Sequence, residues 1–345
     1  MTARASWRVW SLGLTLLALG PAPASPETLG EVYRRVNPSV VVIRARGSEV
    51  TAEGMAHFRE IGSGVLVSAD GKVATAAHVV HTMNEIVVEF LGEDPVPARV
   101  ISSEPRADLS IIQVETVPRD AVVAKLADSD AYLVGDSVFI VGAPYGLSHS
   151  LSQGVISARW APNTVTKDFP LAEFFQTDAV INTGNSGGPM FSRSGDLIGI
   201  VSHNISKSGG SEGLGFVVTS NTVRQLLGQR GRRYYGLDIM LLTGDMAQAF
   251  NLPQPGGFLI KQVALDSIGA RLGLRGGDRV GIIEGQSVVV GGDILLSAQG
   301  IQTASNEELN QVLKTLETIK PGDELRVTVL RDGKVQELSI KIPGQ

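Results

Sequence analysis

The stretch Gly184-Asn185-Ser186-Gly187-Gly188-Pro189 decides the fold of this chain, because it fits two different architectures. As Gly-x-Ser-x-Gly it matches the sharp turn that presents a nucleophilic serine in α/β-hydrolases. That turn stands between a strand and a helix, with an acid and then a histidine further along the chain. Here Pro189 follows at once, then a turn and a strand near Leu197, and the only histidine after the serine is His203. The esterase interpretation fails, and we expect Ser186 in a turn between strands.

The sequence around this turn is typical of β structure. From Ser39 to about Val218, short runs of β-branched residues alternate with turn signals such as Ser194-Gly195-Asp196. The predicted strands cover residues 40–43, 64–67, 86–90, 109–114, 138–141, 197–201 and 215–218. Many short strands with few helices indicate a barrel or a sandwich. We expect a short closing helix over residues 222–229, capped by Asn221.

Two other segments supply the partners that a nucleophilic serine needs. Thr75-Ala76-Ala77-His78 ends an apolar strand with an imidazole, and Asp108 stands at the mouth of a buried strand. A serine hydroxyl needs a general base, and the base needs a third group that fixes its tautomer. We therefore interpret Ser186 as the nucleophile, His78 as the base and Asp108 as the orienting acid. The glycines around Ser186 let the backbone N–H groups of Gly184 and Ser186 face a developing oxyanion.

Composition narrows the class of protein. The chain has 345 residues, 43% of them hydrophobic and 19% charged, which suits about two packed domains. Its formal net charge of −5 argues against a nucleic-acid partner. Cysteine is absent, which excludes disulfides, thiolate zinc sites and a cysteine nucleophile. His78 and His81 lack a third ligand of matching spacing, so we predict no metal site and no cofactor. His57, His81 and His149 stand in polar or loop-like contexts and are expected to be ordinary structural or exposed residues.

The first 24 residues are typical of a targeting segment. Arg4 and Arg8 precede an apolar run of about 12 residues, which is shorter than the ~20 that a membrane-spanning helix needs. Ala22-Pro23-Ala24 then offers a signal-peptidase site. We expect cleavage after Ala24 and an exported, periplasmic protein, with an uncleaved membrane anchor as the alternative.

A second unit follows the basic linker Arg230-Gly231-Arg232-Arg233. It begins at Tyr234 and extends to about residue 343, with strands, a helix near residues 306–316 and a final hairpin that turns at Arg331-Asp332-Gly333. The domain boundaries expected from these features are 1–24, 27–229, 230–233 and 234–343.

The motifs around His78, Asp108 and Ser186 resemble those of chymotrypsin-type serine proteases. Three further motifs narrow the resemblance to the HtrA/Deg family: Gly62-Ser63-Gly64-Val65, Gly142-Ala143-Pro144-Tyr145-Gly146 and Gln176-Thr177-Asp178-Ala179-Val180-Ile181-Asn182. The resemblance implies an all-β, chymotrypsin-like double β-barrel with the triad in its cleft, followed by a smaller α+β PDZ domain.

In this family the PDZ groove captures peptide C-termini. Tyr234-Tyr235-Gly236-Leu237 resembles the carboxylate-binding loop, and residues 305–316 resemble the groove helix. Two departures stand out: Leu265-Asp266-Ser267-Ile268-Gly269 replaces a Pro-Gly-Ser run, and residues 275–290 look like an inserted hairpin.

The substrate pocket is implied by the same likeness. Val180 stands six residues before the nucleophile, at the floor of the pocket in trypsin-like geometry, with Ile181 beside it. No acid is there to bind Arg or Lys, so a small or aliphatic P1 residue is favoured. His203 occupies a position on the pocket-side strand where the family usually has an apolar or small residue.

The resemblance implies an ATP-independent serine endopeptidase that cleaves unfolded or damaged envelope proteins without a cofactor. A short loop between Arg44 and Ile61 implies a homotrimer. The segment between Trp160 and Phe174 is expected to bias Gly184 and Asn185 when a peptide binds the PDZ groove. The alternative is a chaperone-like or peptide-binding scaffold with a resting or vestigial active site.

Overall fold

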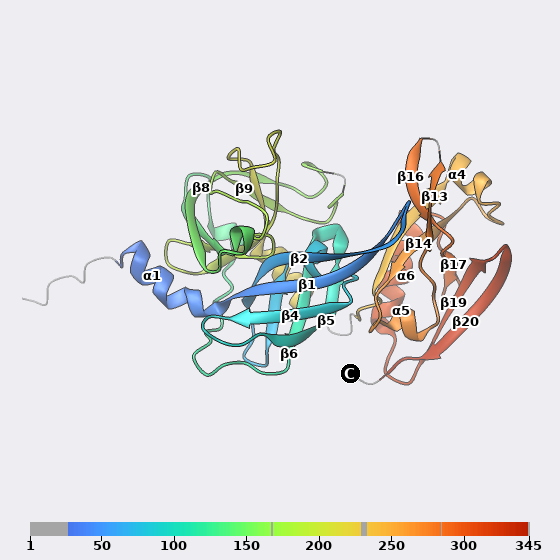
Figure 1. The fold of residues 1–345 in the computed structure, drawn as a ribbon, viewed down its shortest axis with the longest axis horizontal. Helices are drawn as coiled ribbons and strands as arrows, with labels where there is room; N and C mark the ends of the chain where they lie inside the picture. The colour runs from blue at the N-terminus through green and yellow to red at the C-terminus, as the bar shows by residue number, and fades with distance from the viewer. Residues whose placement is uncertain (1–26, 167, 229–232, 284, 344–345) are drawn as a thin grey trace, which may run out of the picture.

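The computed structural model describes residues 27–166, 168–228, 233–283 and 285–343, and β-strands dominate these ranges (Figure 1). The strands form two closed barrels and, after them, a smaller unit of sheet and helices. The predicted fold class is confirmed. The predicted signal peptide, and all of the predicted linker except Arg233, lie outside the described residues.

The first barrel closes in the strand order β1-β2-β3-β6-β5-β4, with antiparallel neighbours. Its strands are β1 (Val40–Thr51), β2 (Gly54–Leu66), β3 (Lys72–Thr75), β4 (Glu85–Phe90), β5 (Val96–Glu104) and β6 (Leu109–Val114). Side chains such as Ile43, Leu66 and Ile112 fill its interior and are fully buried. Alternation along the strands sends the polar side chains outward.

Strands β1 and β2 form one long hairpin that extends from the barrel to the third unit (Figure 1). The expectation of a short loop between Arg44 and Ile61 is wrong, because these two residues lie opposite each other in the ladder, which continues to Thr51 and Gly54. Near the tip, Gln262 Nε2 donates a hydrogen bond to the carbonyl of Ser48 at 3.0 Å. The hairpin therefore connects the first barrel with the third unit.

The second barrel closes in the order β10-β11-β12-β9-β8-β7. Its strands are β7 (Ser137–Gly142), β8 (Ser150–Trp160), β9 (Phe174–Thr177), β10 (Pro189–Ser192), β11 (Leu197–Asn204) and β12 (Gly215–Thr219). Helix α3 (Ser220–Gly228) follows β12 directly. It begins before the predicted cap, so Asn221 lies inside the helix, where its side chain donates to Asp128 at 2.8 Å.

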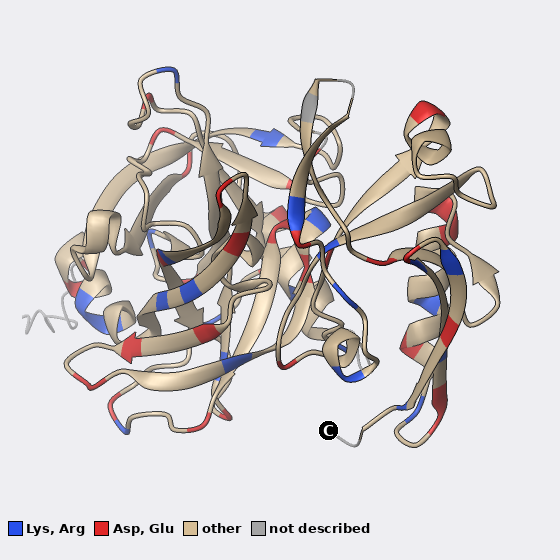
Figure 2. Cartoon of the chain, turned by 45° about the vertical axis from the view of Figure 1, so that its right-hand side comes forward, with Lys and Arg blue, Asp and Glu red and all other residues tan. Residues whose placement is uncertain are grey.

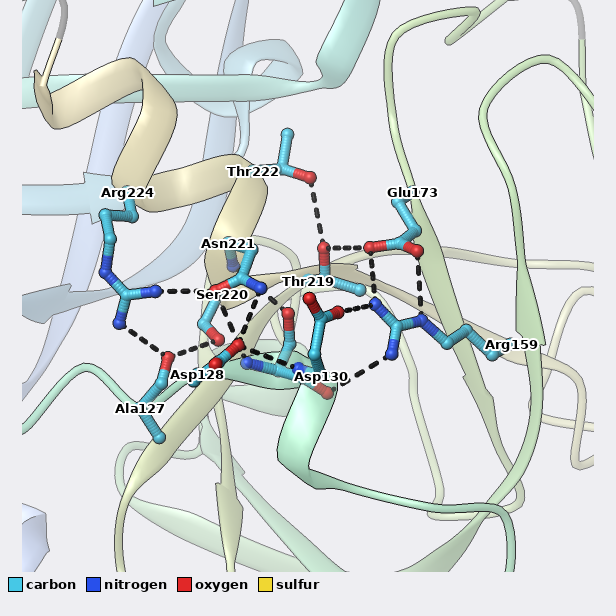
Figure 3. Close-up of polar contacts among 11 residues, drawn as sticks. Ala127, Asp128, Asp130, Arg159, Glu173, Thr219, Ser220, Asn221, Thr222 and Arg224 are labelled. Atoms are coloured by element: carbon cyan, nitrogen blue, oxygen red, sulfur yellow. Dashed lines mark hydrogen bonds and ion pairs between the residues drawn. The ribbon is translucent and has the colours of Figure 1, made fainter.

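A polar network ties the start of α3 to the segment before β9 (Figure 3). Arg159 donates two hydrogen bonds to the Glu173 carboxylate, at 2.9 and 3.0 Å, and also pairs with Asp130. Thr219 Oγ1 donates to the same Glu173 carboxylate at 3.1 Å and lies 3.0 Å from Thr222 Oγ1. Because both ends of the Glu173 carboxylate are occupied, this network holds the segment between β8 and β9 at its β9 end.

An apolar cluster between the two barrels fixes their relative position. Val65 and Ile111 of the first barrel meet Phe139 and Phe191 of the second, and all four are buried. Helix α1 (Leu29–Val36) packs on the same cluster through its buried valines and begins with a capping box between Thr28 and Glu31. Burial of each such side chain contributes roughly 1.5–3 kcal/mol. The relative position of groups from different barrels is therefore set by the core.

Short helical turns connect the strands of the barrels. They are η1 (Asn37–Ser39), α2 (Ala77–Val80), η2 (Pro105–Ala107), η3 (Ser129–Ala131) and η4 (Pro144–Gly146). Two of them lie at the edge of the first barrel: α2 contains the predicted base, and the predicted acid follows η2 directly.

The third unit is a sheet in the order β13-β14-β17-β19-β20, with β18 beside β17. Its strands are β13 (Leu237–Thr243), β14 (Gly256–Val263), β17 (Ile294–Ala298), β18 (Ile301–Gln302), β19 (Glu324–Arg331) and β20 (Lys334–Lys341). Its helices are α4 (Gly244–Ala249), α5 (Ile268–Arg271) and α6 (Asn306–Thr318), the last capped by Ser305. The expected hairpin within residues 275–290 is formed by β15 (Arg279–Ile283) and β16 (Gln286–Val290).

Charged side chains of both signs are interspersed along the barrels and the third unit (Figure 2). A search of the described ranges finds no helix with the length and apolar character needed to span a bilayer.

Candidate active site

The three residues of the predicted triad come from both barrels. His78 lies in α2, one turn past the end of β3, rather than at the strand end itself. Asp108 follows η2 in the left-handed conformation, with φ 50° and ψ 40°, just before β6. Ser186 lies in the turn that precedes β10.

His78 and Asp108 are already joined. The Nδ1 atom of His78 lies 2.9 and 3.0 Å from the two carboxylate oxygens of Asp108, and the His78 backbone N–H donates to Oδ1 at 3.2 Å. Asp108 is 1% exposed, whereas the His78 side chain is 41% exposed. The carboxylate is an acceptor, so Nδ1 of His78 carries the proton and Nε2 is left on the open side of the ring.

The pKa of His78 is raised above its ordinary value. Loss of water around the ring lowers the pKa, but the hydrogen bond and the negative charge of Asp108, together with Glu60, outweigh that loss. The protonated imidazole is therefore favoured more than in a free histidine.

Ser202 is a member of the site that the sequence did not reveal. Its hydroxyl donates to Asp108 Oδ2 at 2.5 Å, across 94 residues of sequence. Ser202 is 1% exposed and lies in β11 of the second barrel. Asp108 is thus held from both barrels at once. A serine in a strand carries no sequence signal for such a contact, since the pairing depends on how the barrels pack.

The turn of Ser186 is held in place by Ser63 from β2. The Ser63 backbone N–H donates to the Ser186 carbonyl at 2.8 Å, and the Ser63 hydroxyl donates to the Gly184 carbonyl at 2.7 Å. That hydroxyl also accepts from the N–H of Ala143 at 3.0 Å. The predicted motif around Ser63 thus has a structural role: it aligns the serine turn with the first barrel.

The Ser186 hydroxyl itself donates to the Ser202 carbonyl at 3.2 Å. Within the described residues, it makes no hydrogen bond to His78. The predicted role of Ser186 requires its hydroxyl to leave this acceptor and to bond to Nε2 of His78 instead.

Gly184 can be replaced by no other residue without strain. Its φ of +101° is one that L side chains rarely adopt, and an added Cβ would lie 2.1 Å from the Ala143 carbonyl oxygen. The Thr183 carbonyl accepts from the Tyr145 N–H at 2.8 Å. In a trans peptide the N–H points opposite to the C=O, so the Gly184 N–H faces away from Tyr145. The role of this N–H as an oxyanion donor stays a prediction.

The two predicted pocket residues differ in environment. Val180 is 49% exposed, while Ile181 is 2% exposed and packs against Gly215, where an added Cβ would lie 2.5 Å from the Ile181 Cδ1 atom. The Ser152 hydroxyl donates to the Val180 carbonyl at 2.9 Å. Their role in substrate selection stays a prediction.

The predicted carboxylate-binding loop, residues 234–237, is anchored by α5 and the segment before it. The Tyr235 carbonyl accepts from the Gly269 N–H at 3.0 Å, and the Gly236 carbonyl accepts from Ala264 at 2.8 Å. Gly236 has a φ of +66°, and an added Cβ would lie 2.2 Å from the Ser267 Cβ atom. The segment that departs from the family pattern therefore packs beneath the loop and supports it.

A cavity of about 360 Å³ lies between β13, α5 and α6 of the third unit. Apolar side chains dominate its walls, among them Ile239, Leu241, Phe258, Leu309 and Val312. Tyr235 is another lining residue, and its buried hydroxyl has no hydrogen-bond partner among the described residues. His81 and residues 103–106 of the first barrel form part of the rim.

Hydrogen bonds cross from the first barrel to this groove. His81 Nε2 donates to the Leu237 carbonyl at 3.0 Å, and the Thr82 N–H donates to the Tyr234 hydroxyl at 3.2 Å. Arg106, in η2, donates to Asn310 of α6 at 2.5 Å. The groove is therefore in contact with the two short segments that carry His78 and Asp108.

A metal centre is not supported by the described residues, which hold no cluster of three or more His, Cys, Asp or Glu side chains placed to bind one.

Comparison with known families and proteins agrees with this architecture. Residues 62–200 match the model of the trypsin-like peptidase domain, and residues 244–342 match that of the PDZ domain. The chain is 32% identical over 293 residues to a protein of Pseudomonas putida (strain GB-1) named "Probable periplasmic serine endoprotease DegP-like". It is 31% identical over 297 residues to a Haemophilus influenzae protein named "Probable periplasmic serine protease do/HhoA-like".

These alignments cover 82% and 84% of this chain but only 56% and 59% of the two relatives, so the chain spans little more than half of their length. Among solved structures, an HtrA-type protease, AlgW, with a tripeptide is 26% identical, has a TM-score of 0.53, and aligns over 92% of this chain and 97% of its own. The same protease with a decapeptide is 25% identical at a TM-score of 0.52, and aligns over 92% of this chain and 98% of its own.

Proposed function

The chain belongs to the HtrA/Deg family of trypsin-like serine proteases with a PDZ domain, and on this basis we propose that it is an ATP-independent serine endopeptidase that cleaves unfolded or damaged envelope proteins. The observation that carries the proposal is the hydrogen-bonded pair of His78 and Asp108 at the junction of the two barrels, beside the glycine-rich turn of Ser186. The relatives named above are described as periplasmic, which supports the proposal of an exported protein. Cleavage of the signal peptide after Ala24 is proposed from the sequence alone.

In the proposed reaction, Ser186 Oγ attacks the peptide carbonyl carbon, and His78 Nε2 takes the hydroxyl proton. His78 then gives this proton to the leaving amine, and a water molecule repeats the sequence on the acyl-enzyme. Asp108 keeps the proton of His78 on Nδ1 and stabilises the imidazolium. The backbone N–H groups of Gly184 and Ser186 bind the oxyanion, each donor being worth about 3–4 kcal/mol.

A second candidate function is a peptide-binding or chaperone-like scaffold. The hydrogen bond from Ser186 Oγ to the Ser202 carbonyl favours it, because the hydroxyl is bonded to a backbone carbonyl and not to His78. The two functions differ in one requirement: the protease needs the Ser186 hydroxyl for chemistry, whereas the scaffold does not.

Cleavage of unfolded casein by the full chain and by Ser186→Ala distinguishes them. The protease predicts that casein is degraded and that the variant loses about 10⁶-fold in turnover. The scaffold predicts that casein is bound by both proteins and degraded by neither.

We propose that the groove regulates the protease by binding peptides with a free, hydrophobic C-terminus. The apolar walls suit a hydrophobic side chain, and the predicted carboxylate-binding loop lies among the residues that line the cavity. The Leu171 N–H donates to the Arg106 carbonyl at 3.0 Å, which links the segment before β9 to the rim of the groove. A bound peptide would act through this segment on the oxyanion turn.

Two finer features of the proposal rest on family likeness. Val180 and Ile181 favour a small or aliphatic P1 residue, with soft discrimination because one methylene is worth only ~1–3 kcal/mol. The protein is expected to assemble as a homotrimer, although the hairpin β1–β2 replaces the short loop on which that expectation was based.

A further inference from the structure

His203 lies next to the catalytic centre, in β11, immediately after Ser202. Its ring is surrounded by three phenylalanines. The Phe216 ring is stacked on it with centroids 5.0 Å apart and planes 14° apart, while Phe169 and Phe174 each lie at 5.5 Å. These contacts hold the imidazole plane in one orientation, on the side of β11 that faces the segment before β9.

A continuous chain of hydrogen bonds leads from this imidazole to the base. His203 Nδ1 lies 3.0 Å from Ser202 Oγ, which lies 2.5 Å from Asp108 Oδ2, and Asp108 contacts His78 Nδ1. A carboxylate only accepts, so the single Ser202 proton is donated to Asp108. The contact with His203 therefore requires that Nδ1 of His203 carries a proton and donates it to Ser202 Oγ.

The donor and the acceptor of each hydrogen bond from His203 to His78 are thus fixed. His203 sets the rotation of the Ser202 hydroxyl, and the Ser202 hydroxyl occupies Asp108 Oδ2 from the second barrel. The Ser202 backbone carbonyl also accepts the Ser186 hydroxyl. The position of this one residue consequently affects both the acid and the nucleophile.

We propose that His203 is a positioning residue of the peptidase reaction, which fixes the Ser202 hydroxyl and thereby holds Asp108 against His78. This inference rests on the proposed function for its kinetic consequences, but the hydrogen-bond chain is measurable without activity.

The charges that face His203 are consistent with a neutral ring in this role. Burial lowers the pKa of His203, the negative charges of Asp108 and Asp168 oppose that effect, and His78 adds to it. A neutral ring with its proton on Nδ1 has the donor that Ser202 needs. A protonated ring would keep that donor but place a second positive charge near the imidazolium of His78 during the reaction.

The test compares His203→Phe with His203→Asn. The phenylalanine keeps a ring for the aromatic contacts but has no donor, while the asparagine amide places a donor close to the position of Nδ1. We expect His203→Phe to lower kcat about 3- to 10-fold, the worth of one hydrogen bond, with KM unchanged, and His203→Asn to recover most of the loss. His57→Phe, on the exposed part of β2, is the matched control and should retain wild-type kcat.

A second readout is the downfield proton resonance of His78 Nδ1–H, recorded by NMR on the inactive Ser186→Ala background. We expect this resonance to weaken or shift upfield with His203→Phe and to be retained with His203→Asn. An unchanged resonance and kcat in a folded His203→Phe variant would overturn the proposal, as would equal losses in both variants. If the wild-type chain cleaves no substrate, the proposed function fails, while the resonance still decides the role of His203.

Discussion

The two barrels have the same strand order, but they differ in whether their site residues already make the hydrogen bonds that the proposed reaction needs. The first barrel supplies His78 and Asp108 as a finished pair, linked through both the side chain and the backbone of His78. The second barrel supplies Ser186 with its hydroxyl bonded to the Ser202 carbonyl instead of to the base. The half of the site formed by His78 and Asp108 is assembled, whereas in the other half the Ser186 hydroxyl must exchange its acceptor to reach the base.

This difference has a physical cause. Asp108 is buried, and a buried carboxylate is tolerated only when its oxygens are satisfied, so its partners are locked in place. The Ser186 hydroxyl is neutral, and exchanging one acceptor for another costs little. The assembled pair of His78 and Asp108 therefore determines the chemistry. Regulation can act on Ser186, whose hydroxyl must still exchange its acceptor.

A substitution in the His78–Asp108 pair should produce the largest loss of turnover. Asp108→Asn removes the charge and favours the wrong tautomer of His78, and we expect turnover to fall by up to about 10⁴-fold with the fold intact. Steady-state cleavage of casein, with circular dichroism as the check on folding, measures this. The control is Asp120→Asn, at an exposed position, which should be neutral; near-wild-type turnover of Asp108→Asn would remove Asp108 from the mechanism.

A backbone change in the Ser186 turn should lower kcat by less than the loss of Asp108 does. Gly184→Ala forces a Cβ against the Ala143 carbonyl at a φ of +101° and displaces one oxyanion donor. We expect kcat to fall about 10²- to 10³-fold, the worth of one such donor. Gly30→Ala, in α1, where a Cβ meets open space, is the matched control and should keep full activity. Equal kcat for both variants would show that Gly184 supplies no donor.

Peptide binding in the groove of the third unit sharpens the comparison, because a bound peptide should act on the Ser186 half of the site. A peptide with a free hydrophobic C-terminus should raise cleavage of a short chromogenic substrate about 5- to 150-fold, the range of typical coupling energies. The amidated form of the same peptide should not. A short substrate cannot reach the groove and the active site together, so tethering alone would leave its rate unchanged. Identical rates with and without either peptide would reject the switch.

The smallest expected effect is a displacement of the pH dependence of kcat/KM, which reports on the His78–Asp108 pair alone. Activity requires neutral His78, so it rises with pH, and the raised pKa of His78 places this acid limb above about pH 6.5. Measuring kcat/KM from about pH 5 to 9 locates the limb. A flat profile over this range would argue against His78 as the base.

Much of the fold could be predicted because local patterns decide it. The runs of β-branched residues mark the buried strands, and the predicted hairpins at residues 275–290 and at Arg331 are present. Strands β5, β9 and β10 were missed. Pro97 and Arg99 interrupt the apolar pattern of β5 where the strand faces solvent, and β9 and β10 are only four residues long. The position of His78 in a short helix was also missed, because α2 is too short to show a helical period.

The predicted candidate site was less complete than the predicted fold. Motifs identify Ser186, His78 and Asp108, since each stands beside glycines or at a strand end. Ser202 carries no such signal, because its contact with Asp108 depends on how the two barrels pack. His203 stood out only as a departure from the family pattern, and nothing in the sequence showed that it contacts Ser202. The contacts of His81 with the groove could not be predicted either, because the sequence does not indicate where the third unit lies against the first barrel.

The central claim, that Ser186 is an activated nucleophile, is tested most directly by covalent labelling with a serine-directed fluorophosphonate. The full chain, with and without a C-terminal peptide, is treated with the probe and digested, and the adduct is located by mass spectrometry. The account predicts an adduct on Ser186, none in Ser186→Ala, and strongly slowed labelling in Asp108→Asn. An adduct on a different serine, or a folded chain that no peptide makes reactive, would contradict it.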